Sequence, residues 1–152
     1  RVFPTLYREG KIELEVVPQG TLAERIRAAG AGIPAFYTPT AVGTILANGK
    51  EQREFDGRTY VMEPWLKADF ALIKSEFADP VGNLKFNKTG RNFSPLMCMA
   101  ATTTIVQTKR LVARGDIDPE HVITPGIFVN RIVEVPGPVH EDTLIAEGRR
   151  YP

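Results

Sequence analysis

The chain has 152 residues, of which 43% are hydrophobic and 24% charged, as expected for one ordinary globular domain. Its net charge of +1 and lack of a basic stripe argue against a nucleic-acid partner, and no apolar run approaches the roughly 20 residues of a membrane span. Cys98 is the single cysteine, which excludes an internal disulfide and fits a reducing cytoplasm.

The first predicted elements are a strand and a helix. The segment Lys11–Val17 alternates and then becomes continuously apolar, as a strand that enters a buried sheet does. A helix is predicted from Thr21, which has capping-box spacing to Glu24, to the glycines Gly30 and Gly32. The sequence therefore begins with a strand–turn–helix unit.

The rest of the chain predicts further alternation of strands and short helices. Pro34 and Pro39 forbid a long helix around them, and Thr40–Leu46 is expected to form a short helix or strand. Then follow a hairpin turning at Asp56-Gly57, a strand over 68–77, a turn at 79–83, a short strand over 84–88, a helix from Ser94-Pro95, and strands over 102–112 and 127–135. We predict a single α/β domain over residues 1–152 with a mostly parallel sheet and a polar tail over residues 137–152.

Gln19 is the first candidate functional residue. In open α/β sheets ligands bind beyond the carboxyl ends of strands, where the turn formed by residues 18–20 is expected to lie. The start of a helix offers free N–H groups and the positive end of its dipole, and an amide side chain can donate to an oxyanion without adding charge. Alternatively, Gln19 only satisfies a backbone group of the turn.

Two other segments are candidates for binding. In Gly30–Thr40 the small residues allow close approach to a ligand and Phe36 and Tyr37 can line a slot, although the pattern alone favours a proline-fixed loop over the core. In Lys88–Pro95 two cations can bind phosphate or carboxylate, but the glycines of a phosphate loop are absent, and the alternative is a solvated loop.

The chain shows no self-sufficient catalytic set. His121 and His140 are far apart without neighbouring ligands, so we expect no metal site. Cys98 lies in an apolar run and is expected to be a small core residue. Either the protein binds without chemistry, or its reactive residue lies on another chain.

Four stretches resemble the A (alpha) subunit of the family I (3-oxoacid) CoA-transferases. They are "GKIELEVVPQGTLAERIRAAGAGIPAFYTPT", "KEQREFDGRTYVMEPWLKADFALIK", "GNLKFNKTGRNFSPLM" and "DIDPEHVITPGIFVNRIV", in the order that the family has them. The resemblance covers most of the chain and is nearest to the enzymes for 3-oxoadipate, with those for acetoacetate second. It implies the CoA-transferase fold of the A-subunit type, an open sheet with helices on both faces.

The resemblance also implies a reaction and a partner. The enzyme would move CoA from succinyl-CoA to a 3-oxoacid as an A/B hetero-oligomer, with the nucleophilic glutamate in a Ser-Glu-Asn-Gly motif of the B subunit. CoA would be a substrate, and no cofactor or metal would be needed. Gln19 would support the oxyanion of acyl transfer, and the segment near the acyl site would comprise Gly32, Ile33, Pro34, Ala35 and Phe36.

Two departures from the family pattern are visible. The family's glycine-rich signature is missing, so we expect that an upstream portion is absent from this sequence. The segment "TAVGT" stands where the family commonly has Thr-Gly-Tyr-Gly-Thr. Because Ala41 and Val42 differ from that pattern, the resemblance does not determine the shape of this loop. The alternatives are a non-catalytic relative with the same fold, such as a sugar-phosphate isomerase-like binding domain, or a purely structural half of a dimer.

Overall fold

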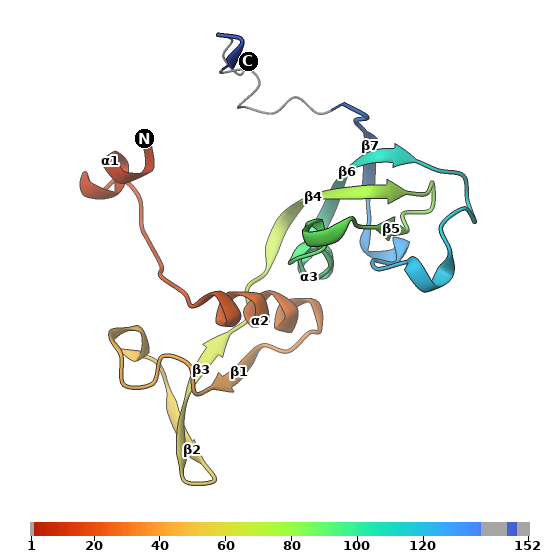
Figure 1. The fold of residues 1–152 in the computed structure, drawn as a ribbon. Helices are drawn as coiled ribbons and strands as arrows, with labels where there is room; N and C mark the ends of the chain where they lie inside the picture. Colours follow the sequence, from red (N-terminus) through yellow and green to blue (C-terminus); the bar gives the residue numbers. More distant parts are fainter. Residues whose placement is uncertain (1, 138–145, 149–152) are drawn as a thin grey trace.

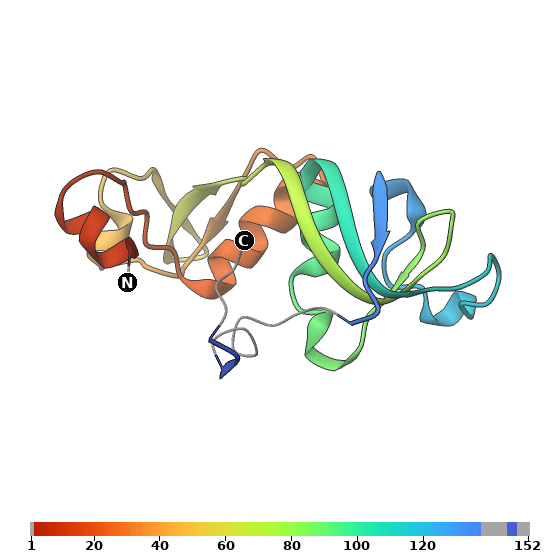
Figure 2. The same ribbon diagram turned by 90° about the horizontal axis from the view of Figure 1, so that it is seen from above.

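The computed structural model describes residues 2–137 and 146–148 and arranges them around two sheets (Figure 1). The helices are α1 (Val2–Arg8), α2 (Gln19–Gly30) and α3 (Ser94–Ala100). The strands are β1 (Ala35–Thr38), β2 (Gln52–Phe55), β3 (Arg58–Pro64), β4 (Ala68–Ala78), β5 (Leu84–Lys85), β6 (Ala101–Leu111) and β7 (Arg131–Glu134). The molecule is elongated, with α1 near one end and the sheet that contains β4 and β6 at the other (Figure 2).

The larger sheet has the strand order β5-β4-β6-β7 and carries the main core. Strand β4 runs parallel to β6 over their whole length, from Ala68 opposite Ala101 to Ala78 opposite Leu111, and β7 is parallel to β6. The edge strand β5 is antiparallel. Helix α3 lies in the crossover from β4 to β6 and packs on α2. The predicted α/β fold with a mostly parallel sheet is confirmed.

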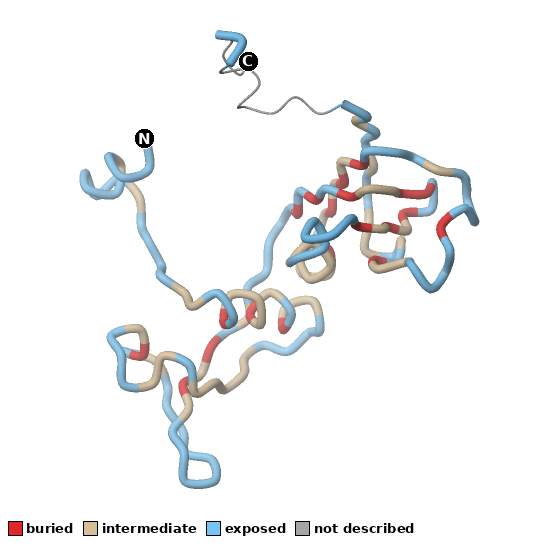
Figure 3. Tube along the Cα trace, viewed as in Figure 1, coloured by how far each residue is buried: buried red, intermediate tan, exposed pale blue. Residues whose placement is uncertain are grey.

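Buried residues recur at alternate positions along β4 and β6, and they are the red segments of these strands in Figure 3. Ile73 and Val106 are paired across the two strands and are both buried. The core cluster consists of Ala71, Ile73, Ala78, Leu84, Phe86, Cys98 and Val106. The alternation of buried and exposed residues along β4 means that its other face is open.

The smaller sheet is antiparallel, with the order β1-β3-β2, and contains the predicted hairpin. Asp56 and Gly57 have φ of 50° and 75°, the left-handed conformation that a tight two-residue hairpin turn requires. Beside the turn, the ring of Phe55 makes edge contacts with Tyr37 and Tyr60. Helix α2 packs against β1 and β3, so this sheet is attached to the larger one through α2 and α3.

The predicted strand over Lys11–Val17 is wrong. The segment forms no strand, and the one backbone hydrogen bond that it makes to another described segment runs from the N–H of Lys11 to the carbonyl of Leu6, at 2.9 Å. Leu14 and Val16 are exposed. An ion pair 2.7 Å long between Glu15 and Arg25 holds the segment to α2. A strand needs a neighbour, and the apolar pattern alone does not provide one.

Both predicted helix caps also differ from the structure. Helix α2 begins at Gln19, because Pro18 with φ −57° is the N-cap residue, and its start has no side-chain cap bond. Glu24 pairs with Arg27 rather than with the helix start. Helix α3 begins at Ser94 as predicted, but the hydroxyl of that serine donates to a backbone carbonyl of the preceding loop instead of capping. Helix α1, with no buried residue, was not predicted.

Other predictions hold in part. The proline-bounded segment expected to be a loop contains the short strand β1, and the segment Thr40–Leu46 leads into a short 3-10 helix at Ile45–Ala47. Most of the predicted tail, residues 138–145 and 149–152, lies outside the described residues. Across the part that is described, no helix is both long and apolar enough to cross a bilayer.

The turn after β4 is a tight junction of backbone and side chains. The buried carboxylate of Asp79 accepts hydrogen bonds from the backbone N–H of Val81 (3.0 Å) and of Asn83 (2.9 Å) and from the amide of Asn83 (2.8 Å). The side-chain oxygen of Asn83 accepts from the N–H of Gly126, 3.1 Å away. Gly126 packs directly on the carbonyl of Val81, so no larger residue fits there. This junction fixes where β5 lies against β4.

Candidate functional site

The start of α2 is an open helix terminus. Gln19 is the first helical residue and is exposed, and Gly20 beside it has open space around its Cα. The first carbonyl acceptor of the helix is that of Pro18, which binds the N–H of Leu22 at 2.9 Å. The N–H groups of the first turn therefore have no helical acceptor, and the absence of a side-chain cap leaves them available to another group.

A hollow of about 380 Å³ lies beside this terminus. Its lining residues come from α2 and from the segment that contains β1: Gly20, Thr21, Glu24, Phe36, Tyr37, Thr38 and Thr40. Strand β1 runs back along α2, which is why residues far apart in the sequence meet here. The wall combines hydroxyl groups, two aromatic rings and one carboxylate.

The charged groups near the hollow are already paired. Arg27 donates to Glu24 and holds the pKa of that carboxyl below its usual value. The phenol of Tyr37 donates to Glu51, which raises the pKa of Tyr37 and lowers that of Glu51. Arg53 also binds Glu51, at 2.8 Å. Within the described chain, the hollow thus has no free carboxylate poised to act as a nucleophile.

The structure separates the site residues predicted from the sequence into two groups. Gln19 is at the start of α2, next to the hollow, although its side chain is not part of the wall. Gly32, Ile33 and Pro34 are exposed in the turn after α2, at the other end of that helix. The 12 residues of the helix separate the two ends by about 17 Å.

The segment Gly32–Phe36 therefore approaches the hollow only at its far end. Ala35 begins β1, and Phe36 alone of these residues lines the hollow. Phe36 and Tyr37 of the candidate segment Gly30–Thr40 both line the hollow, as expected. Thr38 and Thr40 of that segment and Thr21 of α2 line it too, but no binding role was predicted for these threonines individually. The run "YTPT" places hydroxyls at alternate positions, and that pattern was the available signal.

The other sequence candidates lie elsewhere. The loop over Lys88–Pro95 is exposed at its start, and Lys88 has a φ of 49° in a short 3-10 turn. Cys98 is buried in the core, and its burial raises the pKa of the thiol to about 11. A nucleophilic cysteine needs a lowered pKa, because the thiolate is the reactive form. No group of three or more potential metal ligands occurs among the residues that the structure describes.

Comparison with known proteins relates this chain to one family. A family profile described as "Coenzyme A transferase" matches residues 1–135. The chain is 63% identical, over 136 residues, to the A subunit of the 3-oxoadipate CoA-transferase of Pseudomonas putida, with 90% of this chain and 59% of the relative covered. It is 52% identical over 133 residues to the A subunit of a probable succinyl-CoA:3-ketoacid coenzyme A transferase of Bacillus subtilis, covering 88% of this chain and 56% of the relative.

A solved structure agrees with the fold. An acyl-CoA transferase apoenzyme from Escherichia coli O157:H7 superimposes with a TM-score of 0.81 at 22% identity, covering 88% of this chain and 30% of that one. At this identity the likeness concerns the fold alone. The chain spans 59% of the length of the Pseudomonas putida relative, and so corresponds to part of such a protein.

Proposed function

Because the chain belongs to the coenzyme A transferase family, we propose that it acts as part of a CoA-transferase A subunit. The reaction would move CoA from succinyl-CoA to a 3-oxoacid. The 63% identity to the A subunit of a 3-oxoadipate CoA-transferase favours 3-oxoadipate, and the 52% identity to a succinyl-CoA:3-ketoacid relative makes acetoacetate the second candidate. These relatives do not favour the alternative of a sugar-phosphate isomerase-like binding domain.

The observation that carries the proposal is the open terminus of α2 with Gln19 at its first position. Acyl transfer from a thioester passes through tetrahedral intermediates with negative charge on oxygen. A neutral carboxamide and the N–H groups of a helix start are suited to stabilise such an oxyanion, since they donate hydrogen bonds without introducing a carboxylate that would repel it.

The nucleophile in this proposal belongs to a partner. Glu24 is the carboxylate of the hollow, and it is held by Arg27 on the same helix. We therefore propose a B subunit that supplies a glutamate, as the family resemblance implies, and hence a hetero-oligomer. The single buried cysteine is consistent with work in the reducing cytoplasm.

The proposed reaction is a double displacement. The partner's glutamate attacks the carbonyl of succinyl-CoA, expelling the CoA thiolate and forming a mixed anhydride. The thiolate then attacks the glutamyl carbonyl, which releases succinate and leaves CoA as a thioester on the glutamate. The 3-oxoacid carboxylate reverses these steps and leaves as its CoA ester, so no further cofactor or metal is required.

The role of Gln19 follows from these steps. Each attack creates an oxyanion, and we assign Gln19 to stabilise it from the side of the present chain. The segment Gly32–Phe36 would act through Phe36, which lines the hollow and would contact the acyl chain.

The test is Gln19→Ala in the complete A subunit, assayed with its B subunit. Loss of one such donor is expected to lower kcat by about 10²–10³, with little change in thermal stability, since Gln19 is exposed. Gln52→Ala, in the exposed strand β2, is the control and should keep full activity. An unchanged kcat would remove Gln19 from the chemistry, and a loss of stability without a loss of rate would favour a structural role.

A further inference from the structure

Glu63 is a buried carboxylate that the proposed reaction does not use. It lies on β3, and only 1% of its side chain is exposed. Its Oε1 accepts a hydrogen bond from the Nζ of Lys50 at 2.5 Å, and its Oε2 has no hydrogen-bond partner within the described part of the chain. An ionised carboxylate is costly to bury unless a cation compensates its charge, so Lys50 is the group that stabilises it here.

Lys50 and Glu63 stand in one row across the smaller sheet. On one side, Glu63 is paired with Phe36 of β1. On the other side, the register of β2 with β3, continued by two residues before Gln52, places Lys50 opposite Glu63. Side chains paired across antiparallel strands share a face, with their Cβ atoms about 5 Å apart. Phe36, Glu63 and Lys50 therefore lie side by side on the buried face of this sheet, toward α2.

This row ends at the hollow beside α2. Phe36 lines the hollow, whereas Lys50 is at the other end of the row, with 26% of its side chain exposed. Neighbouring strands are about 4.8 Å apart, so the Glu63 carboxylate is about 10 Å from a ligand in the hollow. The other buried cation nearby, Arg25, donates to a backbone carbonyl and to a different carboxylate. Compensation of the Glu63 charge therefore falls to Lys50.

Two other carboxylates at the hollow are compensated in the same way. Glu24 and Glu51 are each paired with an arginine. Together with Glu63, these carboxylates surround the hollow with negative groups whose charges are all balanced by cations. Such a balance suits an anionic occupant, because succinyl groups and 3-oxoacids bring carboxylates to the site and the oxyanion of acyl transfer adds further negative charge.

We propose that Lys50 is a positioning residue of the acyl-transfer site and acts through Glu63. Its ammonium group cancels the buried charge behind Phe36, so that the hollow accepts an acyl group with a carboxylate of its own. This role rests on the proposed function and deepens it, because it gives a residue outside the hollow control over the charge of the 3-oxoacid that is used. An uncompensated charge about 10 Å from a second charge, at an effective dielectric constant of about 20, changes a rate by about tenfold.

The test compares two acids that differ in charge. 3-Oxoadipate carries two carboxylates and acetoacetate carries one, and the ratio of their kcat/KM values is measured with the complete A subunit, its B subunit and succinyl-CoA. Lys50→Met leaves the Glu63 charge uncompensated and is expected to lower the ratio of 3-oxoadipate to acetoacetate by about tenfold. Glu63→Gln leaves the Lys50 cation unpaired and should raise the ratio by about threefold, because this cation is partly exposed and screened. The double variant should return the ratio to within about twofold of its starting value.

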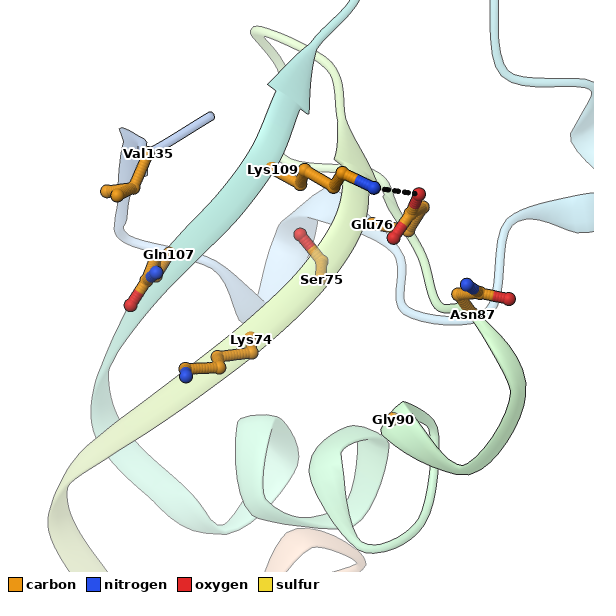
Figure 4. Close-up of a pocket in the computed structure, with 8 residues that line it drawn as sticks. All are labelled: Lys74, Ser75, Glu76, Asn87, Gly90, Gln107, Lys109 and Val135. Atoms are coloured by element: carbon orange, nitrogen blue, oxygen red, sulfur yellow. Dashed lines mark hydrogen bonds and ion pairs between the residues drawn. The ribbon is translucent and has the colours of Figure 1, made fainter. Parts of the chain in front are cut away.

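Two controls separate the effect of charge from a loss of structure. Lys50→Arg keeps the positive charge and should keep the ratio. Lys109→Met removes a lysine from a pair with Glu76, 3.3 Å long on the larger sheet, in which 60% of the lysine side chain is exposed (Figure 4). This variant should leave the ratio unchanged, because an exposed pair far from the hollow contributes little. Lys50→Met should also lower the melting temperature by at least about 5 °C, and the double variant should regain most of that loss.

Three results would overturn the proposal. The first is a fall in kcat/KM by the same factor for both acids in Lys50→Met, which would make the ion pair purely structural. The second is a ratio in the double variant as low as that in Lys50→Met. The third is an unchanged ratio in Glu63→Gln, which keeps a hydrogen-bonding side chain and decides the question even if Lys50→Met does not fold. Absence of CoA transfer to either acid in the unsubstituted complex would instead refute the proposed function, and this role with it.

Discussion

Two arginines on α2 should differ greatly in what they contribute to stability. The side chain of Arg25 is 8% exposed; its Nε donates to the carbonyl of Pro64 at 2.9 Å and its Nη1 to Glu15 at 2.7 Å. Arg27, two positions further on, is exposed and pairs only with Glu24. Arg25 therefore joins three separate segments of the chain, whereas Arg27 joins two residues of one helix.

The magnitudes follow from these contacts. A hydrogen bond to a charged group contributes about 1.5–3 kcal/mol. The bond to Glu15 adds less than about 1 kcal/mol, because that carboxylate is largely solvated. Arg25→Met, which keeps much of the aliphatic volume, is therefore expected to cost about 2–4 kcal/mol. Arg27→Met is expected to be nearly neutral, as for other exposed pairs within a helix.

Urea unfolding followed by circular dichroism measures the difference. With a slope of about 2 kcal/mol per molar urea, Arg25→Met should lower the midpoint by about 1–2 M, and Arg27→Met by less than about 0.3 M. Glu15→Gln should reproduce only the smaller part of the Arg25 effect, because the bond to Pro64 remains. Equal losses for the two arginine variants would refute the reasoning that burial and the number of joined segments decide the contribution.

Three further predictions concern the core and the turn after β4. Asp79→Ala removes the acceptor of three hydrogen bonds and should cost about 2–4 kcal/mol in urea unfolding, whereas Asp69→Ala, at an exposed site, should be nearly neutral. Gly126→Ala would force a methyl group into a backbone carbonyl and should lower the melting temperature by at least about 5 °C, whereas Gly137→Ala, with open space around it, should not; equal melting temperatures would contradict the close packing. Cys98, with a pKa raised to about 11, should carry about 10²-fold less thiolate at pH 8 than the unfolded chain, so iodoacetamide should react with it only after unfolding. Above a pH of about 8.5 the unfolded chain releases the proton of this thiol whereas the folded chain retains it, so the free energy of unfolding falls as the pH rises from about 8.5 toward 11. Rapid alkylation of the native protein at pH 8 would contradict the burial of the thiol.

Sequence reasoning succeeded where local patterns and pairing agree. The Asp56-Gly57 turn can adopt left-handed backbone angles, and the β-branched run from Thr102 to Val106 forms β6 as predicted. It failed for Lys11–Val17, whose apolar pattern is correct for a strand but has no described neighbour. Pairing depends on what lies beside a segment, and a sequence pattern does not contain that information.

The candidate site was predictable to a lesser degree. The helix start and Gln19 could be located from the turn that precedes α2, but the capping residues of that turn suggested the wrong first residue, because proline itself occupied the N-cap position. The hollow depends on β1 running back along α2, so that Phe36 and Thr38 approach Gly20. That contact arises from tertiary packing, and the pattern "IPAFYTPT" alone did not predict even that its centre is a strand.

The long pairing of β4 with β6 has a consequence for how the chain folds. Each paired residue of β4 lies opposite a residue of β6 that follows the whole crossover, from Ala68 opposite Ala101 to Ala78 opposite Leu111. A turn, β5, a short 3-10 helix at Lys88–Gly90 and α3 intervene, so this crossover must close before the many hydrogen bonds of the pairing can form. The β2–β3 hairpin closes through a two-residue turn, so we expect its amides to gain protection first during refolding and those of β4 and β6 to gain it later.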